Sequence, residues 1–384
     1  MPTDKLEAVP DTSDPRPASV SMRIAILGTR GIPNRYGGFE QFAEYLAFGL
    51  RERGHEVAVY LPGFHPFKEP ELNGVTLIRK PSPERLLGSA ANFLYDYLCL
   101  KDAVRQCFDL VLECGYGTAS PSYLIVPLGR TKVVTNMDGL EWKRSKWSPA
   151  VQRLTRWFEE LAVRRSHALV ADNLGIQEYL ARAYGVHSHY IPYGADPVAS
   201  AGVGHLGRYG VAAGNYALAI ARLEPENNLE MLIDGYMLAR PDFPLLIVGN
   251  HLTPYGSALQ ERCKGFPAIR FLGGIYDKPV IDSLRHHALL YFHGHSVGGT
   301  NPSLLEAMAC GSFISAHDNT FNRSVLGGNA LYFTTPKDIR NHLVSAPVHL
   351  REAFVASNFA KLDKDFSWCS VIDRYEALFR SLLV

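Results

Sequence analysis

The chain has 384 residues, of which 47% are hydrophobic and 20% are charged. This composition is typical of a folded globular protein that is long enough for two domains. The 39 Lys and Arg residues nearly balance the 38 Asp and Glu residues, so the net charge gives no reason to expect nucleic-acid binding. No apolar run approaches the roughly 20 residues that a membrane-spanning helix requires.

The N-terminal stretch 1–21 is rich in Pro, Asp, Ser and Thr and lacks the apolar core of a signal peptide, so we expect a disordered leader. The six cysteines form no C-x-x-C pair and mostly lie in apolar segments. This pattern predicts buried thiols in a reducing cytoplasm, and neither a disulfide framework nor a zinc site.

After the leader, strands and helices alternate, which predicts an α/β fold with parallel sheets covered by helices on both faces. The strands of a first unit are expected at 23–28, 56–61, 75–80, 110–114, 132–136 and 168–171. Helices are expected at about 39–53, 89–106 and 149–165. These elements predict a first Rossmann-like domain over residues 22–195.

A Gly- and Ala-rich stretch from about 190 to 214 is typical of a linker. A second set of strands is expected at 216–221, 245–248, 269–272, 289–292, 313–315 and 331–333. They predict a second Rossmann-like domain over residues 196–365 that faces the first across a cleft. The last helix, at about 367–382, has one apolar face, so residues 366–384 are expected to cross back onto the first domain.

The loop after the first strand, Gly28-Thr29-Arg30-Gly31, superficially resembles a dinucleotide-binding turn. It lacks the G-x-G-x-x-G spacing, however, and the second strand ends in Tyr60-Leu61-Pro62 without a ribose-binding acid. The loop is also long and carries the pair Gly37-Gly38 before the helix. We therefore expect Gly31, Gly37 and Gly38 to approach a bound sugar or phosphate across the cleft, although a plain flexible turn is the alternative.

The most informative stretch runs from residue 293 to 311 and reads H-G-H-S-V-G-G-T-N-P-S-L-L-E-A-M-A-C-G. It predicts a strand end, a glycine loop, and a helix with Asn301 as its N-cap and Gly311 after its end. Glycines let backbone N–H groups approach a diphosphate, and a helix N-terminus favours negative charge. An ordinary strand–loop–helix connection remains the alternative for this stretch taken alone.

Three motifs together resemble the GT-B retaining glycosyltransferases of family 4. They are G-T-R-G-I-P-N-R-Y-G-G-F-E at 28–40, A-R-L-E-P-E-N-N-L at 221–229, and the donor stretch described above. The resemblance covers nearly the whole chain after about Met22 and is greatest to the bacterial rhamnosyltransferases. It implies two Rossmann-like domains, a nucleotide-sugar donor, no metal, no cofactor, and cleft closure about a hinge formed by the linker and the last helix.

The resemblance also implies residue roles on the donor side. Arg222 matches the arginine that binds the donor diphosphate. Most members carry a lysine a few residues later, where this chain has Glu226-Asn227-Asn228, and Asn228 is a candidate to bind the donor. Glu306 matches the second glutamate of the E-x7-E motif, which holds the nucleotide ribose, whereas Gly298 replaces the first. The rhamnosyltransferases share this glycine, and their donor is dTDP-L-rhamnose. The remaining donor-side candidates are His293, His295, Gly299, Thr300 and Asn301, although a lone cleft histidine is as often structural.

On the acceptor side, the segment N-M-D-G-L-E-W at 136–142 follows a strand, where α/β sites occur. Asp138 is the best candidate to orient or partly deprotonate the acceptor hydroxyl, although Asp-Gly is also a common turn. Asp172 and Glu141 are second-rank candidates. Trp142, Lys143 and Arg144 begin a segment of aromatic and basic residues that ends near 165. It suits anionic lipid headgroups or a polyprenyl pyrophosphate, or is an ordinary helix with a basic outer face.

The leading hypothesis is a cytoplasmic rhamnosyltransferase, peripheral on the inner face of the membrane. Its acceptor would be a polysaccharide or a lipid-linked sugar, such as N-acetylglucosamine on polyprenyl pyrophosphate, made for a cell-surface polysaccharide. One alternative keeps the fold and uses a UDP- or GDP-hexose donor. A second is a non-catalytic nucleotide-sugar-binding protein, and a third is a sugar-nucleotide epimerase.

Overall fold

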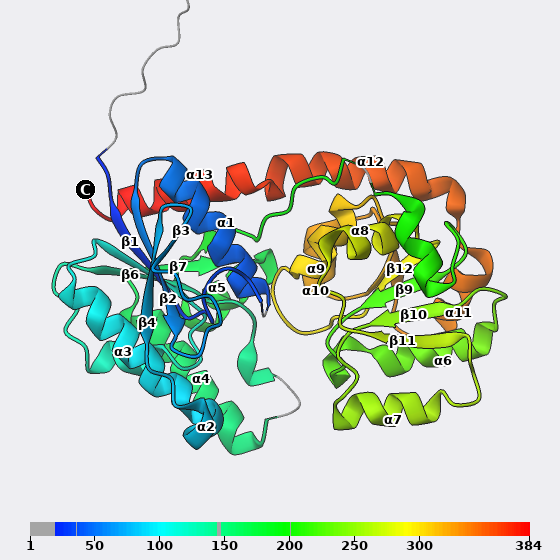
Figure 1. The fold of residues 1–384 in the computed structure, drawn as a ribbon, viewed down its shortest axis with the longest axis horizontal. Helices are drawn as coiled ribbons and strands as arrows, with labels where there is room; N and C mark the ends of the chain where they lie inside the picture. Colours follow the sequence, from blue (N-terminus) through cyan, green and yellow to red (C-terminus); the bar gives the residue numbers. More distant parts are fainter. Residues whose placement is uncertain (1–19, 36, 144–146, 200) are drawn as a thin grey trace, which may run out of the picture.

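The computed structural model describes residues 20–35, 37–143, 147–199 and 201–384. Two α/β lobes lie side by side, each built on its own sheet, and the C-terminal helices run along one edge of both (Figure 1). Within the described residues, no helix is both long and apolar enough to cross a membrane.

The first lobe contains an eight-stranded sheet in the order β3-β4-β2-β1-β5-β6-β7-β8, parallel except for β3 against β4. The apolar runs that predicted its strands are buried, because helices cover the sheet on both sides. Its elements are β1 (Arg23–Leu27), α1 (Gly38–Glu52), β2 (Glu56–Pro62), β3 (Glu71–Leu72), β4 (Val75–Lys80), α2 (Glu84–Leu87), η1 (Gly88–Ala90), α3 (Ala91–Arg105), β5 (Leu110–Cys114), η2 (Ser120–Leu124), β6 (Lys132–Asn136), η3 (Glu141–Lys143), α4 (Pro149–Arg165), β7 (Ala168–Ala171), α5 (Leu174–Tyr184) and β8 (His189–Tyr190).

The second lobe contains a six-stranded parallel sheet in the order β11-β10-β9-β12-β13-β14. In both sheets the order reverses beside the first strand, which is where α/β proteins place ligands. Its elements are η4 (Val203–Tyr209), β9 (Ala217–Ile220), η5 (Pro225–Asn227), α6 (Leu229–Ala239), β10 (Leu245–Val248), α7 (Pro254–Arg262), β11 (Ile269–Gly273), α8 (Lys278–His287), β12 (Leu290–His293), α9 (Pro302–Ala309), β13 (Ile314–His317), α10 (Thr320–Leu326), β14 (Leu331–Phe333), α11 (Pro336–Ser345), η6 (Val348–Leu350), α12 (Arg351–Lys361), the π-helical turn η7 (Leu362–Phe366) and α13 (Trp368–Ser381).

The last helix, α13, lies against α1 of the first lobe (Figure 1). The Trp368 ring stacks on Tyr45 with centroids 4.5 Å apart, and Tyr375 packs against Phe42 at 5.3 Å. Gly194 also contacts the Trp368 ring, and an added Cβ there would lie 2.5 Å from it. The chain therefore passes between the lobes twice, once after β8 and once before α13.

The predicted strands and long helices agree with the structure to within two residues at each end. The two-residue strands β3 and β8 were not predicted, because such short edge strands leave no periodic pattern. The stretch expected to be a linker is partly folded: Leu206 of η4 is buried, and Ser283 of α8 donates to the Gly202 carbonyl at 2.7 Å. Four of the six free cysteines are buried as expected, whereas Cys107 and Cys369 are exposed.

Candidate functional site

The donor loop, defined as residues 294–300, connects β12 to α9 at the C-terminal edge of the second sheet. The N-cap Asn301 accepts the Ser303 N–H at 2.9 Å, and Pro302 occupies the first turn. Gly298 has a φ of +128°, a conformation that L side chains rarely adopt. The strand, glycine loop and helix N-terminus predicted from the sequence are therefore all present.

A second loop, from Arg222 to Asn228, lies beneath the donor loop and fixes its shape. The Asn228 side-chain amide donates to the Gly294 carbonyl at 2.8 Å, and the Ser296 N–H donates to the Glu226 carbonyl at 3.0 Å. A Cβ on Gly294 would lie only 2.1 Å from the Asn227 carbonyl oxygen, so the two loops are in direct contact. Asn228, expected to bind the donor, thus uses its side-chain amide to hold the donor loop.

Arg222 offers the exposed positive charge of this region. Its side chain is 71% exposed, and its guanidinium lies 4.0 Å from the Glu224 carboxylate, at the limit of an ion pair. A largely solvated arginine beside a glycine loop can turn toward an incoming diphosphate without breaking a buried contact.

Glu306 projects from α9 toward the first lobe and is bound on both carboxylate oxygens. The buried guanidinium of Arg285 pairs with Oε2, and Gln41 of α1 donates to Oε1 at 3.2 Å. Arg285 in turn contacts Ser303 and Asp282. This position, between the lobes beside the helix N-terminus, suits a carboxylate that accepts hydrogen bonds from ribose hydroxyls.

His293 and His295 stack with ring centroids 4.3 Å apart and an interplanar angle of 13°. His293 is fully buried, and neither of its ring nitrogens has a hydrogen-bond partner within the described structure. Burial, followed by the neighbouring His295, holds the pKa of His293 well below its usual value. Burial and the charge of Arg222 lower the pKa of His295 to about 3. Both rings are therefore neutral at physiological pH, so they can hydrogen-bond a ligand but do not neutralise its charge.

The acceptor loop, defined as residues 137–143, follows β6 and contacts the donor loop directly. Asp138 has a φ of +45°, and its N–H donates to the Asn136 side-chain oxygen at 3.1 Å. An added Cβ on Gly139 would lie 2.8 Å from the Gly298 Cα. This contact brings Asp138, predicted to act on the acceptor, next to the glycines predicted to bind the donor.

The C-terminal part of the acceptor loop is aromatic and basic. Lys143 and Arg156 lie over the Trp142 ring, at 5.4 and 5.3 Å from its centroid. The Glu141 N–H donates to the Tyr116 hydroxyl at 3.2 Å, which fixes the backbone of this turn. Arg144, assigned to the acceptor from the sequence, falls outside the described residues.

Asp172, at the end of β7, lies against the donor loop. Its side chain is fully buried, and Oδ2 accepts the Thr300 N–H at 2.9 Å. The Thr300 hydroxyl donates to the Asp172 carbonyl, and an added Cβ on Gly299 would lie 2.0 Å from Asp172 Oδ1. The N–H and the hydroxyl of Thr300, a donor-side candidate, are therefore both bound to Asp172, which was a second-rank candidate on the acceptor side.

The glycines of the N-terminal motif occupy different environments. An added Cβ on Gly38 would lie 3.0 Å from the Pro302 ring, so this glycine contacts the start of α9 in the other lobe. Gly37 precedes it in extended conformation. Gly31 has a φ of +89°, and an added Cβ would lie 2.3 Å from the Leu61 Cβ. Gly31 therefore packs closely against β2 within the first lobe, and its nearest neighbours do not belong to the donor loop.

Comparisons with known proteins cover both lobes. Residues 21–196 match a domain of unknown function, DUF1972, and residues 214–352 match the family described as Glycosyl transferases group 1. HepE of Anabaena, solved with UDP and glucose, superposes with a TM-score of 0.74 at 19% identity, over 94% of this chain and 100% of that one. The sucrose-phosphate synthase of Thermosynechococcus elongatus superposes with a TM-score of 0.75 at 14% identity, over 94% and 98%. A search of curated proteins found no match.

The protein has the GT-B fold. A glycosyltransferase from Rickettsia africae superposes equally well, with a TM-score of 0.73 at 13% identity, over 94% of this chain and 99% of that one. In this GT-B protein, the described residues contain no group of three or more His, Cys, Asp or Glu side chains arranged to hold a metal ion.

Two buried groups that hold Glu306 and the acceptor loop were missed by sequence reasoning. Arg285 lies on α8 beside apolar residues, and nothing in its spacing indicates that it pairs with Glu306 on α9. Glu159 of α4 accepts hydrogen bonds from the hydroxyls of Tyr179 and Tyr184, both at 2.6 Å, and of Tyr116 at 3.2 Å. The Tyr116 hydroxyl also accepts the Glu141 N–H, so Tyr116 links Glu159 to the backbone of the acceptor loop.

Proposed function

We propose that this protein is a retaining, metal-independent glycosyltransferase that moves L-rhamnose from dTDP-L-rhamnose to a lipid-linked or polysaccharide acceptor. The observation that carries the proposal is the contact between the two loops, at Gly139 and Gly298. It brings a carboxylate, Asp138, within one residue of a glycine loop that leads into a helix N-terminus. Arg222 supplies an exposed positive charge on the donor side.

The chemistry follows from these positions. The bond between the sugar C1 and the diphosphate oxygen breaks, and the acceptor oxygen bonds to C1 on the same face of the sugar. Asp138 orients the acceptor hydroxyl, and the departing phosphate oxygen takes its proton. Arg222 and the N-terminus of α9 stabilise the negative charge that develops on the diphosphate. The nucleoside diphosphate is then released.

The shape of the donor loop supports a donor other than a glucose or mannose nucleotide. The family resemblance implies a glutamate at the position of Gly298 in glucose- and mannose-transferring members, and the φ of +128° at Gly298 disfavours any side chain there. The rhamnosyltransferases carry glycine here. The competing proposal is a UDP-hexose donor, and its support is that the similar HepE structure contains UDP and glucose.

The surface around α4 supports a lipid-linked acceptor at the inner face of the cytoplasmic membrane. Its exposed side includes Leu154 and Trp157 beside Arg153 and Arg156. A groove of about 700 Å³ next to it is lined by Arg153, Arg156, Arg164, Trp157 and Tyr184, among others. Apolar and basic side chains on one helix suit an interface with anionic headgroups or a lipid pyrophosphate.

Thermal shift with dTDP, UDP, GDP and ADP, first without and then with magnesium, tests the donor. A ligand that binds the native state raises the unfolding midpoint once its concentration exceeds the dissociation constant. A metal-free shift with dTDP supports the rhamnosyl donor, and transfer to lipid-linked N-acetylglucosamine then tests the acceptor. A preference for UDP or GDP would replace dTDP-L-rhamnose by a UDP- or GDP-hexose as the proposed donor. The absence of a shift with every nucleotide would favour a non-catalytic protein.

A further inference from the structure

The buried carboxyl group of Asp172 lies where the two lobes meet. It accepts the Thr300 N–H, while the adjacent Asn173 donates to the Thr300 hydroxyl at 3.3 Å, to the Phe321 carbonyl at 3.4 Å and to Ser324 Oγ at 2.9 Å. Asn173 also caps α5 by accepting the Gly175 N–H at 2.8 Å. The end of β7 and the start of α5 therefore bind both the donor loop and α10 of the other lobe.

The surroundings of Asp172 disfavour a negative charge. The titratable groups that face it are Asp138 from the acceptor loop, Tyr190 of β8, Tyr193 after β8 and Tyr375 of α13. None of these four groups is cationic, and among the described residues Asp172 Oδ1 is buried without a hydrogen-bond partner. Burial, followed by the charge of Asp138, raises the pKa of Asp172 well above its usual value.

We propose that Asp172 is a positioning residue that couples closure of the cleft to the conformation of the donor loop, through its hydrogen bond to the Thr300 N–H. The inference deepens the proposed function, because the same loop would receive the donor diphosphate. In the closed form the carboxyl group is neutral: Oδ2 accepts the Thr300 N–H, and the proton resides on Oδ1. Ionisation would place an unpaired charge beside Asp138 and beside the anionic donor, so closure weakens as pH rises through the pKa of Asp172.

The test measures hydrogen exchange of the peptide segment that contains Thr300, between about pH 5 and about pH 9, the range into which buried carboxyl groups shift. It uses the full chain without nucleotide and corrects for the intrinsic pH dependence of exchange. The variants are D172N, which keeps a neutral acceptor, and D172A, which removes it. The control is D96N, because Asp96 is a comparably buried carboxyl in the first lobe whose partner is Thr118.

We expect the wild type and D96N to lose protection at the Thr300 amide as pH rises. D172N keeps its protection across the range, and D172A exchanges about tenfold faster at every pH, which is the scale of one lost hydrogen bond. Equal pH dependence in wild type and D172N overturns the proposal, and so does a D172N variant as unprotected as D172A. Either of these two overturning results would instead indicate that Asp172 has a purely structural role.

A second readout separates this inference from the donor assignment. Binding of both dTDP and UDP is measured by calorimetry at the two ends of the pH range. Whichever nucleotide binds, we expect its affinity for the wild type to fall at high pH and its affinity for D172N to stay constant. If the wild type binds neither nucleotide, the proposed function is wrong. The exchange result at Thr300 would still decide the role of Asp172.

Discussion

Arg222 and Asp138 lie on opposite sides of the cleft in different environments. Arg222 is largely exposed and has only a long contact with Glu224, so it can reorganise around an incoming anion. Asp138 lies in a turn whose backbone is fixed by Asn136 and by contact with the donor loop. Under the proposed function, we therefore expect Arg222 to act on binding of the donor and Asp138 to act on the acceptor during the reaction.

Arg222→Ala is expected to raise the donor KM about tenfold to a hundredfold with a smaller change in kcat, because it removes a charged partner of the diphosphate. Steady-state kinetics with varied donor concentration measures the split. Arg340→Ala is the matched control, since Arg340 is exposed on α11 in the second lobe. An unchanged donor KM in R222A would remove the phosphate assignment.

Asp138→Asn is expected to lower kcat about 10²-fold and to leave the donor KM nearly unchanged, because it removes the carboxylate that orients the acceptor hydroxyl and keeps the size of the side chain. Nucleotide binding to D138N, measured by calorimetry, should match that of the wild type. A near-normal kcat would transfer the acceptor role to another residue of the cleft.

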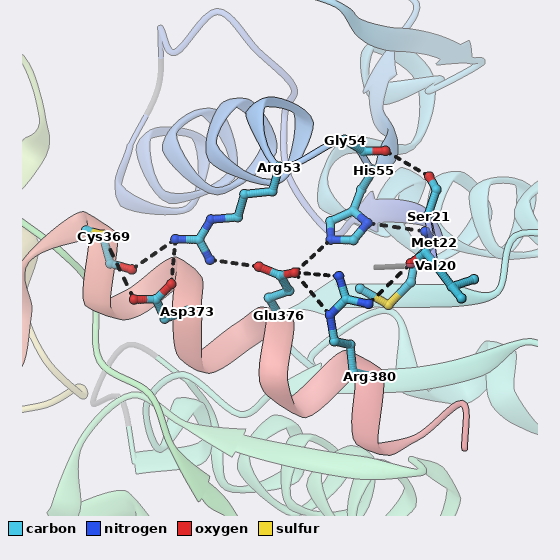
Figure 2. Close-up of polar contacts among 10 residues, drawn as sticks. All are labelled: Val20, Ser21, Met22, Arg53, Gly54, His55, Cys369, Asp373, Glu376 and Arg380. Carbon is cyan, nitrogen blue, oxygen red and sulfur yellow. Dashed lines mark hydrogen bonds and ion pairs between the residues drawn. The ribbon is translucent and has the colours of Figure 1, made fainter. Parts of the chain in front are cut away.

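At the scale of the element, α13 is attached to the first lobe by a partly buried polar network (Figure 2). Glu376 accepts hydrogen bonds from Arg53 at 2.9 Å and from Arg380 at 2.6 Å, and it pairs with His55 at 3.2 Å. The Met22 N–H donates to His55 Nδ1 at 3.2 Å, so Nε2 carries the proton given to Glu376. One carboxylate thus joins the helix to the start of β1 and the end of α1.

Glu376→Gln is expected to destabilise the protein by about 2 to 3 kcal/mol at neutral pH. Despite partial burial, hydrogen bonds from Arg380, Arg53 and His55 lower the pKa of Glu376 from 4.5 to about 2. A depressed pKa stabilises the fold above the unfolded pKa, and this contribution is lost as pH falls from about 4.5 toward 2. Thermal midpoints should therefore differ more at neutral pH than in acid, whereas E160Q, in an exposed pair with Arg164, should change little.

The outer face of α4 carries the proposed membrane contact. The double variants R153E/R156E and L154A/W157A are each expected to reduce binding to phosphatidylglycerol vesicles about tenfold or more, since each basic residue contributes roughly 1 kcal/mol near an anionic surface. Vesicle flotation measures this binding. The control is K337E/R340E on α11, at the far end of the other lobe, which changes the net charge by the same amount as R153E/R156E. It should bind the vesicles as the wild type does. An equal loss in R153E/R156E and K337E/R340E would indicate a non-specific charge effect.

Local patterns and long-range contacts were not equally accessible from the sequence. The strand ends, the N-cap Asn301 and Gly311 after the end of α9 follow from residue types within a few positions, so their prediction is confirmed. Contacts such as Gln41 with Glu306 join residues 265 positions apart, and no periodicity encodes them. Asp172 illustrates the difference: its position after a strand was evident, but its burial against Thr300 depends on how two lobes meet.

At the scale of the whole molecule, the two connections between the lobes lie side by side. The Ala195 N–H donates to the Phe366 carbonyl at 2.8 Å, and the Trp368 N–H donates to Asp196 at 3.3 Å. Beyond them, Val198 is bound to the Ala309 carbonyl and η4 packs on α8. We therefore propose that the hinge is confined to the residues around 195 and 366, a shorter segment than the linker predicted from composition.

Closure about this hinge should depend on Asn173, which makes three hydrogen bonds to the second lobe. Asn173→Ser keeps a good N-cap for α5 but is too short to reach Ser324, Phe321 or Thr300. Small-angle scattering should show compaction of the wild type on addition of dTDP, or of whichever nucleotide binds, and little compaction of N173S. S324A removes one of the three contacts and should be intermediate, because each net hydrogen bond contributes about 1 kcal/mol. Full compaction of N173S would mean that the lobes close through other contacts, such as Gly38 with Pro302.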